Sequence, residues 1–346
     1  MSHAAAVRGS RGPPGRSPAS YPRGPMRRLA ILDDYQQVAG SLADWSRLET
    51  TVDVQIFHDH LAGLDALAER LHDFEIIVAM RERSPFPAAL FERLPKLELL
   101  VSTGPRNRAI DLDAARNAGV VVCGTRAVGT GTVELTWGLI IALARNIARE
   151  DAAVRGGQWQ ISLGPELGGR TIGIVGLGRV GARVAEIAAA FGMSAIAWSE
   201  NLTAERAAAV GARLVGKDEL FESADIVTLH VVLSERTRGL VGARELALMK
   251  PSAYLVNTAR GPIVDEQALV SALDAGSIAG AALDVFDEEP LPLGHPLRAL
   301  PNTVVTPHIG YVARDAYEAF YGDALEDVEA FLAGSPIRLL DPPPAG

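Results

Sequence analysis

The sequence has very little cysteine, since Cys123 is the only one among 346 residues. A single thiol excludes an intramolecular disulfide and any metal site built from several cysteines, and it suits a reducing compartment. We therefore expect a cytoplasmic protein in which Cys123 packs in a strand.

Long hydrophobic runs and an excess of positive charge are missing too. The longest central apolar run, "WGLIIALA" at 137–144, is far below the roughly 20 residues that a membrane-spanning helix needs. Lys and Arg number 33 against 42 Asp and Glu, so the formal net charge is -9. This balance disfavours nucleic acid or an anionic membrane as a partner, because either would require a basic face. A small-molecule ligand is the expectation.

The length of the chain favours two domains, each with its own core. Residues 1–26 contain Gly, Pro, Ser and Arg but no acidic residue, which predicts a disordered tail. Two alternatives are an organellar transit peptide and sequence upstream of a natural start at Met26. Hydrophobic residues make up 48% of the whole chain, which is enough for globular packing.

Apolar runs alternate with helical or loop segments from Arg28 onward, and continuous apolar strands of this kind indicate parallel sheets covered on both faces. The fold class is therefore α/β, with two doubly wound parallel-sheet domains. One domain is expected at 27–130 together with 311–346, and the other at 131–310. The expected strands are 29–34, 52–57, 74–80, 97–103, 119–125, 171–176, 194–199, 225–230, 252–259, 279–286 and 302–307.

Two helices have particular meaning. Residues 131–150 predict one long helix that is apolar on nearly every side and so needs burial all round. Burial between two domains and a partner subunit predicts a homodimer, whereas a core helix inside one monomer is the alternative. Residues 313–334 predict an amphipathic helix that returns to the first domain, which makes that domain discontinuous.

The stretch "GIVGLGRVG" follows an expected strand and opens an expected helix. Gly176 would allow the tight turn, Gly178 would let the backbone approach a pyrophosphate, and Gly181 would let helix and strand pack closely. Arg179 and Val180 begin the helix, and Arg179 adds charge. The pattern predicts a dinucleotide-binding loop, against the alternative of a structural turn.

The next strand should end in an acid that binds the adenosine ribose, but the sequence there reads "AWSENLT". Ser199 stands where the acid is expected and Glu200 follows it. Polar side chains at Ser199, Asn201 and Thr203 suit a 2′-phosphate, whereas Glu200 would repel one. We predict NAD as the cofactor and keep NADP as the alternative.

Five ordered motifs now carry a family resemblance: "GLGRVG", "LHVVLSERTRGLV", "VNTARGPIVDEQAL", "AALDVFDEEPLP" and "TPHIG", at 176–181, 229–241, 256–269, 281–292 and 306–310. From about Arg28 to about Leu339 the chain resembles the D-isomer-specific 2-hydroxyacid dehydrogenase family, which includes phosphoglycerate dehydrogenases and hydroxypyruvate reductases. The resemblance implies a flavodoxin-like substrate domain and a Rossmann NAD(P)-binding domain with a cleft between them, in a homodimer.

The resemblance also implies three catalytic residues. Arg260 in "NTARG" would bind the substrate, Glu289 in "DEEP" would be the acidic partner, and His308 in "TPHIG" would be the general acid/base. Their chemistry fits the reduction of a 2-oxoacid, because an imidazolium supplies a proton near neutral pH and a guanidinium fork binds a carboxylate. For each of these residues considered alone, a purely structural role is the alternative.

Further residues are assigned by the same resemblance. Asp284 would accept from the nicotinamide carboxamide, or alternatively cap its strand; Thr258 and Ala259 would line the nicotinamide, and His230 the ribose. Val232 departs from the family, where proline is common, so the contacts of its loop are a weaker inference.

In the first domain, Arg81 would be an extra substrate-binding arginine, or a solvated surface charge. The loop "STGPRN" would bind the substrate carboxylate through backbone N–H groups of Gly104, Arg106 or Asn107, because Pro105 has none. No metal is expected, since the other histidines lack a second ligand at metal spacing and are predicted at the surface. They are His58, His60, His72 and His295.

The sequence therefore predicts an NAD(P)-dependent D-2-hydroxyacid dehydrogenase that acts on a CH-OH group, or on the corresponding 2-oxoacid in reverse. A formate dehydrogenase-like enzyme is one alternative, although that relative typically has Gln at the position of Glu289. A dinucleotide-sensing, corepressor-like binding protein on the same fold is another, but it leaves the set Arg260, Glu289 and His308 without a use.

Overall fold

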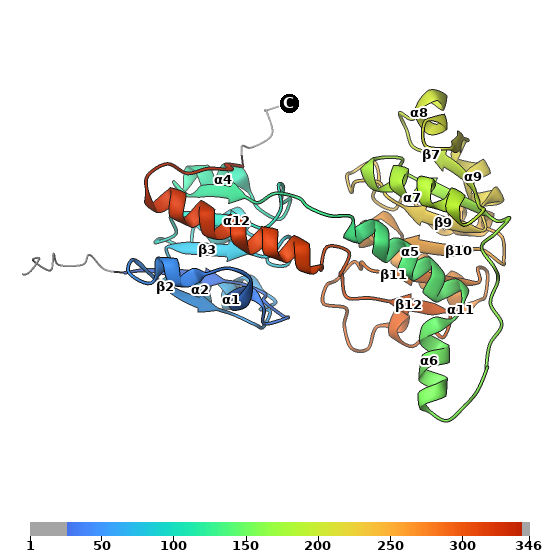
Figure 1. The fold of residues 1–346 in the computed structure, drawn as a ribbon, viewed down its shortest axis with the longest axis horizontal. Coiled ribbons are helices and arrows are strands. Elements are labelled where there is room, and N and C mark those ends of the chain that lie inside the picture. The colour runs from blue at the N-terminus through green and yellow to red at the C-terminus, as the bar shows by residue number, and fades with distance from the viewer. Residues whose placement is uncertain (1–25, 341–346) are drawn as a thin grey trace, which may run out of the picture. The chain divides into compact units, whose positions relative to one another are not determined.

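The computed structural model of the protein describes residues 26–340, so the expected tail at 1–26 lies outside the described residues except for Met26. Two compact units are present (Figure 1). Within the described residues, the first contains 26–102, Arg106–Gly124 and 325–340. The second contains Thr103–Pro105 and Thr125–Ala324. Each unit is an α/β fold built on one parallel sheet, which confirms the predicted fold class.

The first unit has a five-stranded sheet in the order β2-β1-β3-β4-β5, with every neighbouring pair parallel. This order is the flavodoxin-like one. Its strands are short apolar runs, and Leu29 and Ile77 are fully buried. Cys123 lies buried in β5, as predicted. The strands are β1 (Arg27–Ile31), β2 (Val52–Ile56), β3 (Ile76–Ala79), β4 (Leu99–Ser102) and β5 (Val121–Gly124).

Short helices connect these strands, and local sequence sets their ends. Asp111, for example, precedes α4 and its carboxylate accepts a hydrogen bond from the N–H of Ala114, an N-cap that satisfies an otherwise unpaired donor. The helices are α1 (Ala39–Leu42), η1 (Trp45–Leu48), α2 (Leu64–Leu71), α3 (Ala88–Phe91) and α4 (Leu112–Asn117).

The second unit has a seven-stranded parallel sheet in the order β12-β11-β10-β9-β6-β7-β8. The chain runs from β6 outward to β8 and then returns to β9 on the other side of β6, so the strand order reverses between β6 and β9. In such sheets ligands bind outside the carboxyl ends of the strands at this reversal. The strands are β6 (Thr171–Val175), β7 (Ser194–Trp198), β8 (Ala212–Leu214), β9 (Ile226–Leu229), β10 (Tyr254–Asn257), β11 (Gly280–Leu283) and β12 (Thr303–Val305).

Both faces of this sheet are covered by helices. Residues of α5 and α7 pack with strand residues in one core cluster, and residues of α9, α10 and α11 pack with them in a second. The helices are α5 (Gly131–Ala144), α6 (Ile147–Arg155), α7 (Arg179–Ala190), α8 (Ala204–Ala208), α9 (Lys217–Ser223), α10 (Ala243–Leu248), α11 (Glu266–Asp274) and α12 (Arg314–Leu332), with short 3₁₀ turns η2 (Gly261–Ile263) and η3 (Pro296–Arg298).

The single helix predicted at 131–150 was wrong, because the chain forms α5 and α6 with a break between them. Asn146 at the break has a left-handed φ of 54°, a conformation that Asn tolerates better than most residues. Close packing explains why the helix stops: a Cβ on Gly164 would lie 2.0 Å from the carbonyl oxygen of Ala144, so a returning loop covers the end of α5. Within its unit α5 is a core helix, with Trp137 and Ile140 buried.

The remaining differences are at element ends and at a sheet edge. The strand β8 was not expected, because it has only 3 residues and pairs on one side, with β7. The amphipathic helix predicted at 313–334 is α12, and its buried residues recur at helical spacing through Tyr317, Tyr321 and Val328. From Leu325 onward α12 belongs to the first unit.

Candidate functional site

The glycine-rich loop connects β6 to the N-terminus of α7, as the fingerprint requires. Gly176 has φ 97°, and a Cβ there would lie 2.8 Å from the carbonyl carbon of His230. A Cβ on Gly181 would lie 2.2 Å from the oxygen of Gly176. These two glycines therefore permit close backbone packing, whereas a Cβ on Gly178 would meet nothing within 4 Å. The open space at Gly178, at the end of a 12-residue helix, fits a phosphate group.

Four other predicted cofactor residues lie close to this loop along the chain or follow the strand beside it. Arg179 is exposed at the first position of α7, and Val180 follows it half-buried. Ser199 follows β7, which pairs with β6, and Glu200 after it is exposed. The hydroxyl of Thr203 accepts from the N–H of Arg206 and so caps α8, which gives that side chain a structural use.

His230 follows β9, the strand on the other side of β6. Its ring Nε2 lies 3.0 Å from the hydroxyl of Thr228. Burial lowers the pKa of His230 to about 4, because a desolvated ring disfavours the charged form. The ring is therefore neutral near pH 7, and the backbone of His230 and Val231 packs against Gly176.

The three predicted catalytic residues follow three neighbouring parallel strands. Arg260 follows β10, Glu289 follows β11, and His308 follows β12. Because the carboxyl ends of parallel strands meet at one edge, the fold brings the three loops to the same edge of the sheet.

The loop after β10 is held by Asn257. Its side-chain amide donates to the carbonyl of Arg260 at 2.9 Å and its side-chain oxygen accepts from the N–H of Ala259 at 3.0 Å. Thr258 is buried with its hydroxyl 2.9 Å from that of Thr136 on α5. The guanidinium of Arg260 donates to the carbonyl of Ala259 at 2.7 Å, so the arginine is half-buried on a fixed loop.

Asp284 holds the loop after β12. One carboxylate oxygen accepts from the hydroxyl of Thr306 at 2.6 Å and from the N–H of Ile309 at 2.8 Å, and the other accepts from the N–H of Gly310 at 2.8 Å. Burial raises the pKa of Asp284 and these hydrogen bonds oppose the rise. The carboxylate therefore organises the turn that carries His308, while binding of a carboxamide by Asp284 stays a prediction.

His308 and Glu289 are in direct contact. The Nδ1 atom of His308 lies 2.6 Å from Oε2 of Glu289, and Oε1 of Glu289 accepts from the N–H of Phe286 at 2.9 Å. The edge of the His308 ring faces Tyr311, with centroids 5.7 Å apart. His308 has a left-handed φ of 54°, which is unusual for a residue other than glycine. Since the carboxylate engages Nδ1, Nε2 is the nitrogen available to a reacting group.

The predicted substrate residues near the first sheet have internal partners. Arg81 is half-buried rather than solvated, with its Nε 3.6 Å from a carboxylate oxygen of Glu82. The N–H of Gly104 donates to the hydroxyl of Thr125 at 2.6 Å, so that donor is already used inside the chain. An anion-binding nest would therefore depend on the N–H groups of Arg106, which is exposed, and Asn107, which is buried.

Sequence reasoning missed a buried network in the first unit. The carboxylate of Asp33, two residues after the end of β1, lies 2.8 Å from Nδ1 of His60 and accepts from the hydroxyl of Ser84 at 2.8 Å. The expectation of a surface position was wrong for His60 and His295, which are both half-buried beside carboxylates, while His58 and His72 are exposed. The doubled acid at the end of an apolar strand was the available signal.

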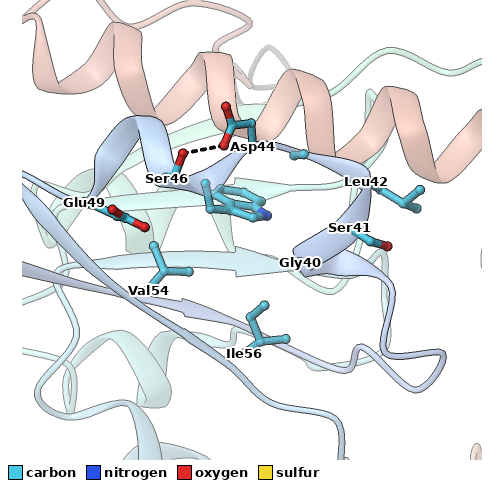
Figure 2. Close-up of a pocket in the computed structure, with 10 residues that line it drawn as sticks. Gly40, Ser41, Leu42, Asp44, Ser46, Glu49, Val54 and Ile56 are labelled. Atoms are coloured by element: carbon cyan, nitrogen blue, oxygen red, sulfur yellow. Dashed lines mark hydrogen bonds between the residues drawn. The ribbon is translucent and has the colours of Figure 1, made fainter.

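Two surface hollows contain none of the predicted site residues. One, of about 630 Å³, lies in the first unit between α1, η1 and the edge strand β2, and Figure 2 shows its lining by Leu42, Val54 and Ile56 together with Asp44, whose carboxylate accepts from Ser46. The other, of about 560 Å³, lies between α11 and η3.

Across residues 26–340 there is no group of three or more His, Cys, Asp or Glu side chains placed to hold a metal ion. In the same described range, no helix has both the length and the apolar character needed to cross a membrane.

Comparison with known proteins identifies the second unit. Residues 137–310 match the family model for the D-isomer specific 2-hydroxyacid dehydrogenase NAD binding domain. The glycine loop and all three predicted catalytic residues lie within this match. The open space at Gly178 fits the pyrophosphate of such a cofactor.

Individual relatives extend the similarity to most of the chain. The glyoxylate reductase of Aeropyrum pernix is 42% identical over 255 residues, which cover 71% of this chain and 76% of that protein. The D-3-phosphoglycerate dehydrogenase of Methanocaldococcus jannaschii is 38% identical over 78% of this chain but only 52% of its own length. The crystal structure of phosphoglycerate oxidoreductase from Vibrio cholerae matches with a TM-score of 0.85 at 37% identity, covering 90% of this chain and 100% of that one.

Proposed function

Because this chain belongs to the D-isomer-specific 2-hydroxyacid dehydrogenase family and is therefore an NAD-dependent oxidoreductase, we propose that it reduces a small 2-oxoacid to the D-2-hydroxyacid. A nicotinamide held by the dinucleotide-binding unit would supply the hydride to C2. The protein must then supply a proton to the carbonyl oxygen and a site for the substrate carboxylate. The observation that carries the proposal is the 2.6 Å contact between His308 and Glu289.

His308 is the proposed proton donor. With Nδ1 held by Glu289, the Nε2–H of the imidazolium gives its proton to the carbonyl oxygen as the hydride arrives at C2, so the carbonyl becomes a hydroxyl and the ring becomes neutral. Glu289 fixes the orientation of the ring through Nδ1, and its second oxygen stays on the N–H of Phe286.

Arg260 is the proposed substrate-binding residue. Its planar guanidinium can bind a carboxylate with two parallel hydrogen bonds and polarise the neighbouring carbonyl. Two observations support this role. Arg260 follows β10, which is the neighbour of the strand β11 that precedes Glu289, and the hydrogen bonds of Asn257 fix its loop. The roles of Arg81 and Arg106 in substrate binding remain predictions.

NAD is the proposed preference over NADP. The support is that Glu200, exposed two residues after the end of β7, would repel a 2′-phosphate bound at this strand end, and that Thr203 is engaged as a helix cap. The proposed contacts of the cofactor are the loop 176–181 for the pyrophosphate, Ser199 and Glu200 for the adenosine ribose, and Thr258, Ala259, His230 and Asp284 for the nicotinamide side.

The organisation of the protein is part of the proposal. Residues 27–130 with 311–346 would form the substrate domain and 131–310 the dinucleotide-binding domain of a cytoplasmic homodimer. Sedimentation of the purified chain tests the dimer.

The decisive experiment is oxidation of NADH and NADPH, in separate assays, with glyoxylate, hydroxypyruvate, pyruvate and bulkier 2-oxoacids. We expect turnover with NADH and at least one small 2-oxoacid, and its loss in His308→Ala. The exposed His72 gives a matched control, since His72→Ala removes a ring far from β12 in the sequence and should leave turnover unchanged. Dinucleotide binding without turnover on any substrate would contradict the reductase assignment and favour a sensor.

A further inference from the structure

The loop that carries Glu289 is fastened to the protein at both ends by one carboxylate. This loop runs from the end of β11 to η3, and we call residues 286–295 the acid loop. Oε2 of Glu266, the first residue of α11, accepts from the N–H of Asp287 at 3.3 Å. Oε1 of Glu266 lies 3.0 Å from Nε2 of His295. Glu266 therefore bridges the beginning and the end of the acid loop.

The second contact of His295 assigns a tautomer to the ring. Its Nδ1 accepts from the N–H of Leu297 at 3.3 Å and caps η3. A ring nitrogen that accepts carries no proton, so the proton of the neutral ring is on Nε2 and is donated to Glu266. Each of the two ring nitrogens thus has a separate task.

Close packing joins the acid loop to the loop of Arg260. A Cβ on Gly261 would lie 2.1 Å from the carbonyl carbon of Phe286 and 2.6 Å from the nitrogen of Asp287. The peptide that Glu266 holds is therefore the one that packs against the residue after Arg260. Its neighbour, the N–H of Phe286, is the group that orients Glu289.

The acid loop concentrates negative charge, and Glu266 adds to it: burial and then the charge of Glu266 raise the pKa of Asp287. Asp287, Glu288 and Glu289 are consecutive acids on an exposed segment and repel one another. Arg298 holds the far side of the loop by donating to the carbonyls of Leu291 and Pro292. Glu266 connects Asp287, near the beginning of the loop, to His295 at its end.

We propose that Glu266 and His295 are positioning residues that fix Glu289 against His308, and the proposal rests on the catalytic roles given above. Neither side chain touches His308. They act through the backbone at 286 and 287, which sets the orientation of the Glu289 carboxylate and thereby that of the imidazole. A shift of about 1 Å in such a group is enough to cost a large part of the rate.

Two substitutions of His295 separate its two nitrogens. His295→Gln places an amide N–H near the position of Nε2 and keeps a donor to Glu266, but loses the cap of η3. His295→Asn places its polar atoms near Nδ1 and keeps the cap, but cannot reach Glu266. Glu266→Gln removes one of the two acceptors. Glu219→Gln is the matched control, because Glu219 pairs with Arg213 on the surface of the same unit.

The test measures kcat with NADH and the 2-oxoacid that the wild type uses, the Kd of NADH, and hydrogen exchange of the peptide at 284–298. We expect Glu266→Gln and His295→Asn to lower kcat about tenfold with an unchanged Kd, and to speed exchange at 286–295. His295→Gln should restore both readouts to near wild type, and Glu219→Gln should alter neither. In a Glu289→Gln background, Glu266→Gln should have no further effect on kcat.

Equal losses in His295→Asn and His295→Gln, or a loss of NADH affinity without a loss of kcat, would overturn the positioning role. So would additive losses in the double variant. A wild-type protein without turnover would contradict the proposed function instead, and hydrogen exchange would then still decide whether Glu266 and His295 fasten the acid loop.

Discussion

Each unit places a histidine against a carboxylate at the carboxyl edge of its parallel sheet, yet the two pairs differ in what surrounds them. In the second unit the side chains of His308 and Glu289 are 26% and 33% exposed. In the first unit those of His60 and Asp33 are 14% and 3% exposed, and Ser84 occupies the second oxygen of Asp33. The pair of His308 and Glu289 can therefore contact a ligand, whereas the pair of His60 and Asp33 is enclosed by residues of its own unit.

The difference teaches that a histidine beside a carboxylate does not by itself identify a general acid. His308 also has an arginine at the same edge of the sheet, after β10, which is separated from β12 by β11, and a loop held by Asp284. The network of Asp33 instead ties together the residues that follow β1, β2 and β3. Substitutions in the two networks should therefore differ in their effects on catalysis and on stability.

Substitution of each histidine by Gln should affect kcat differently in the two units. His308→Gln should lower kcat for 2-oxoacid reduction by about 100-fold or more, because general acid catalysis contributes about that much. His60→Gln should change kcat less than about threefold while lowering stability. Steady-state kinetics on both variants, with NADH affinity as a control for folding, checks the contrast, and a comparable loss of kcat in both would break it.

Asp33→Asn should destabilise the first unit without disturbing the dinucleotide site. Asn tolerates the left-handed φ of 56° at this position, so the substitution isolates the loss of the carboxylate. We expect a loss of about 2 kcal/mol, because one partner of a buried hydrogen-bonded network is left unsatisfied. Urea unfolding measures it, and Asp44→Asn, an exposed carboxylate in the same unit, is the control. An unchanged urea midpoint would make the network irrelevant to stability.

His230 has no carboxylate partner among the hydrogen bonds and ion pairs of residues 26–340, and its pKa of about 4 gives a prediction with a definite sign. The unfolded chain takes up the proton near pH 6.5 and the folded chain only near pH 4, so stability falls as the pH drops through that window. For a partly exposed ring we expect roughly 1 to 2 kcal/mol. The difference between wild type and His230→Gln in urea unfolding at pH 7.5 and pH 4.5 should show it, with His72→Gln as the control; an equal pH dependence in wild type and His230→Gln would refute it.

Gly178→Ala should affect the ligand and not the fold. The added Cβ meets no protein atom within 4 Å, so thermal stability should stay within about 0.5 kcal/mol of wild type. The same methyl group would occupy the space proposed for the pyrophosphate and should weaken NADH binding by about tenfold. Gly181→Ala, where the Cβ would clash with Gly176, should destabilise the second unit instead. Tight NADH binding by Gly178→Ala would move the cofactor away from this loop.

The fold class and most of the strands could be predicted from the sequence, because hydrophobic runs must be buried and their length and alternation with helices leave few arrangements. It also placed the glycine loop, since Gly176 and Gly181 are required by local backbone geometry. Local pattern failed at Asn146, where packing by Gly164 ends a helix that composition would continue, and at the edge strand β8, which depends on pairing with β7.

The hydrogen-bond partners of the polar side chains could be identified from the tertiary structure but not from the sequence. Asp284 was readable as an acid at a strand end, but the three donors that it binds come from residues 306–310. His295 and His60 were predicted at the surface, but the fold brings His295 to Glu266 at the acid loop and His60 to Asp33. A linear sequence specifies burial through composition, whereas a hydrogen bond between distant residues depends on positions that only the packed strands and helices provide.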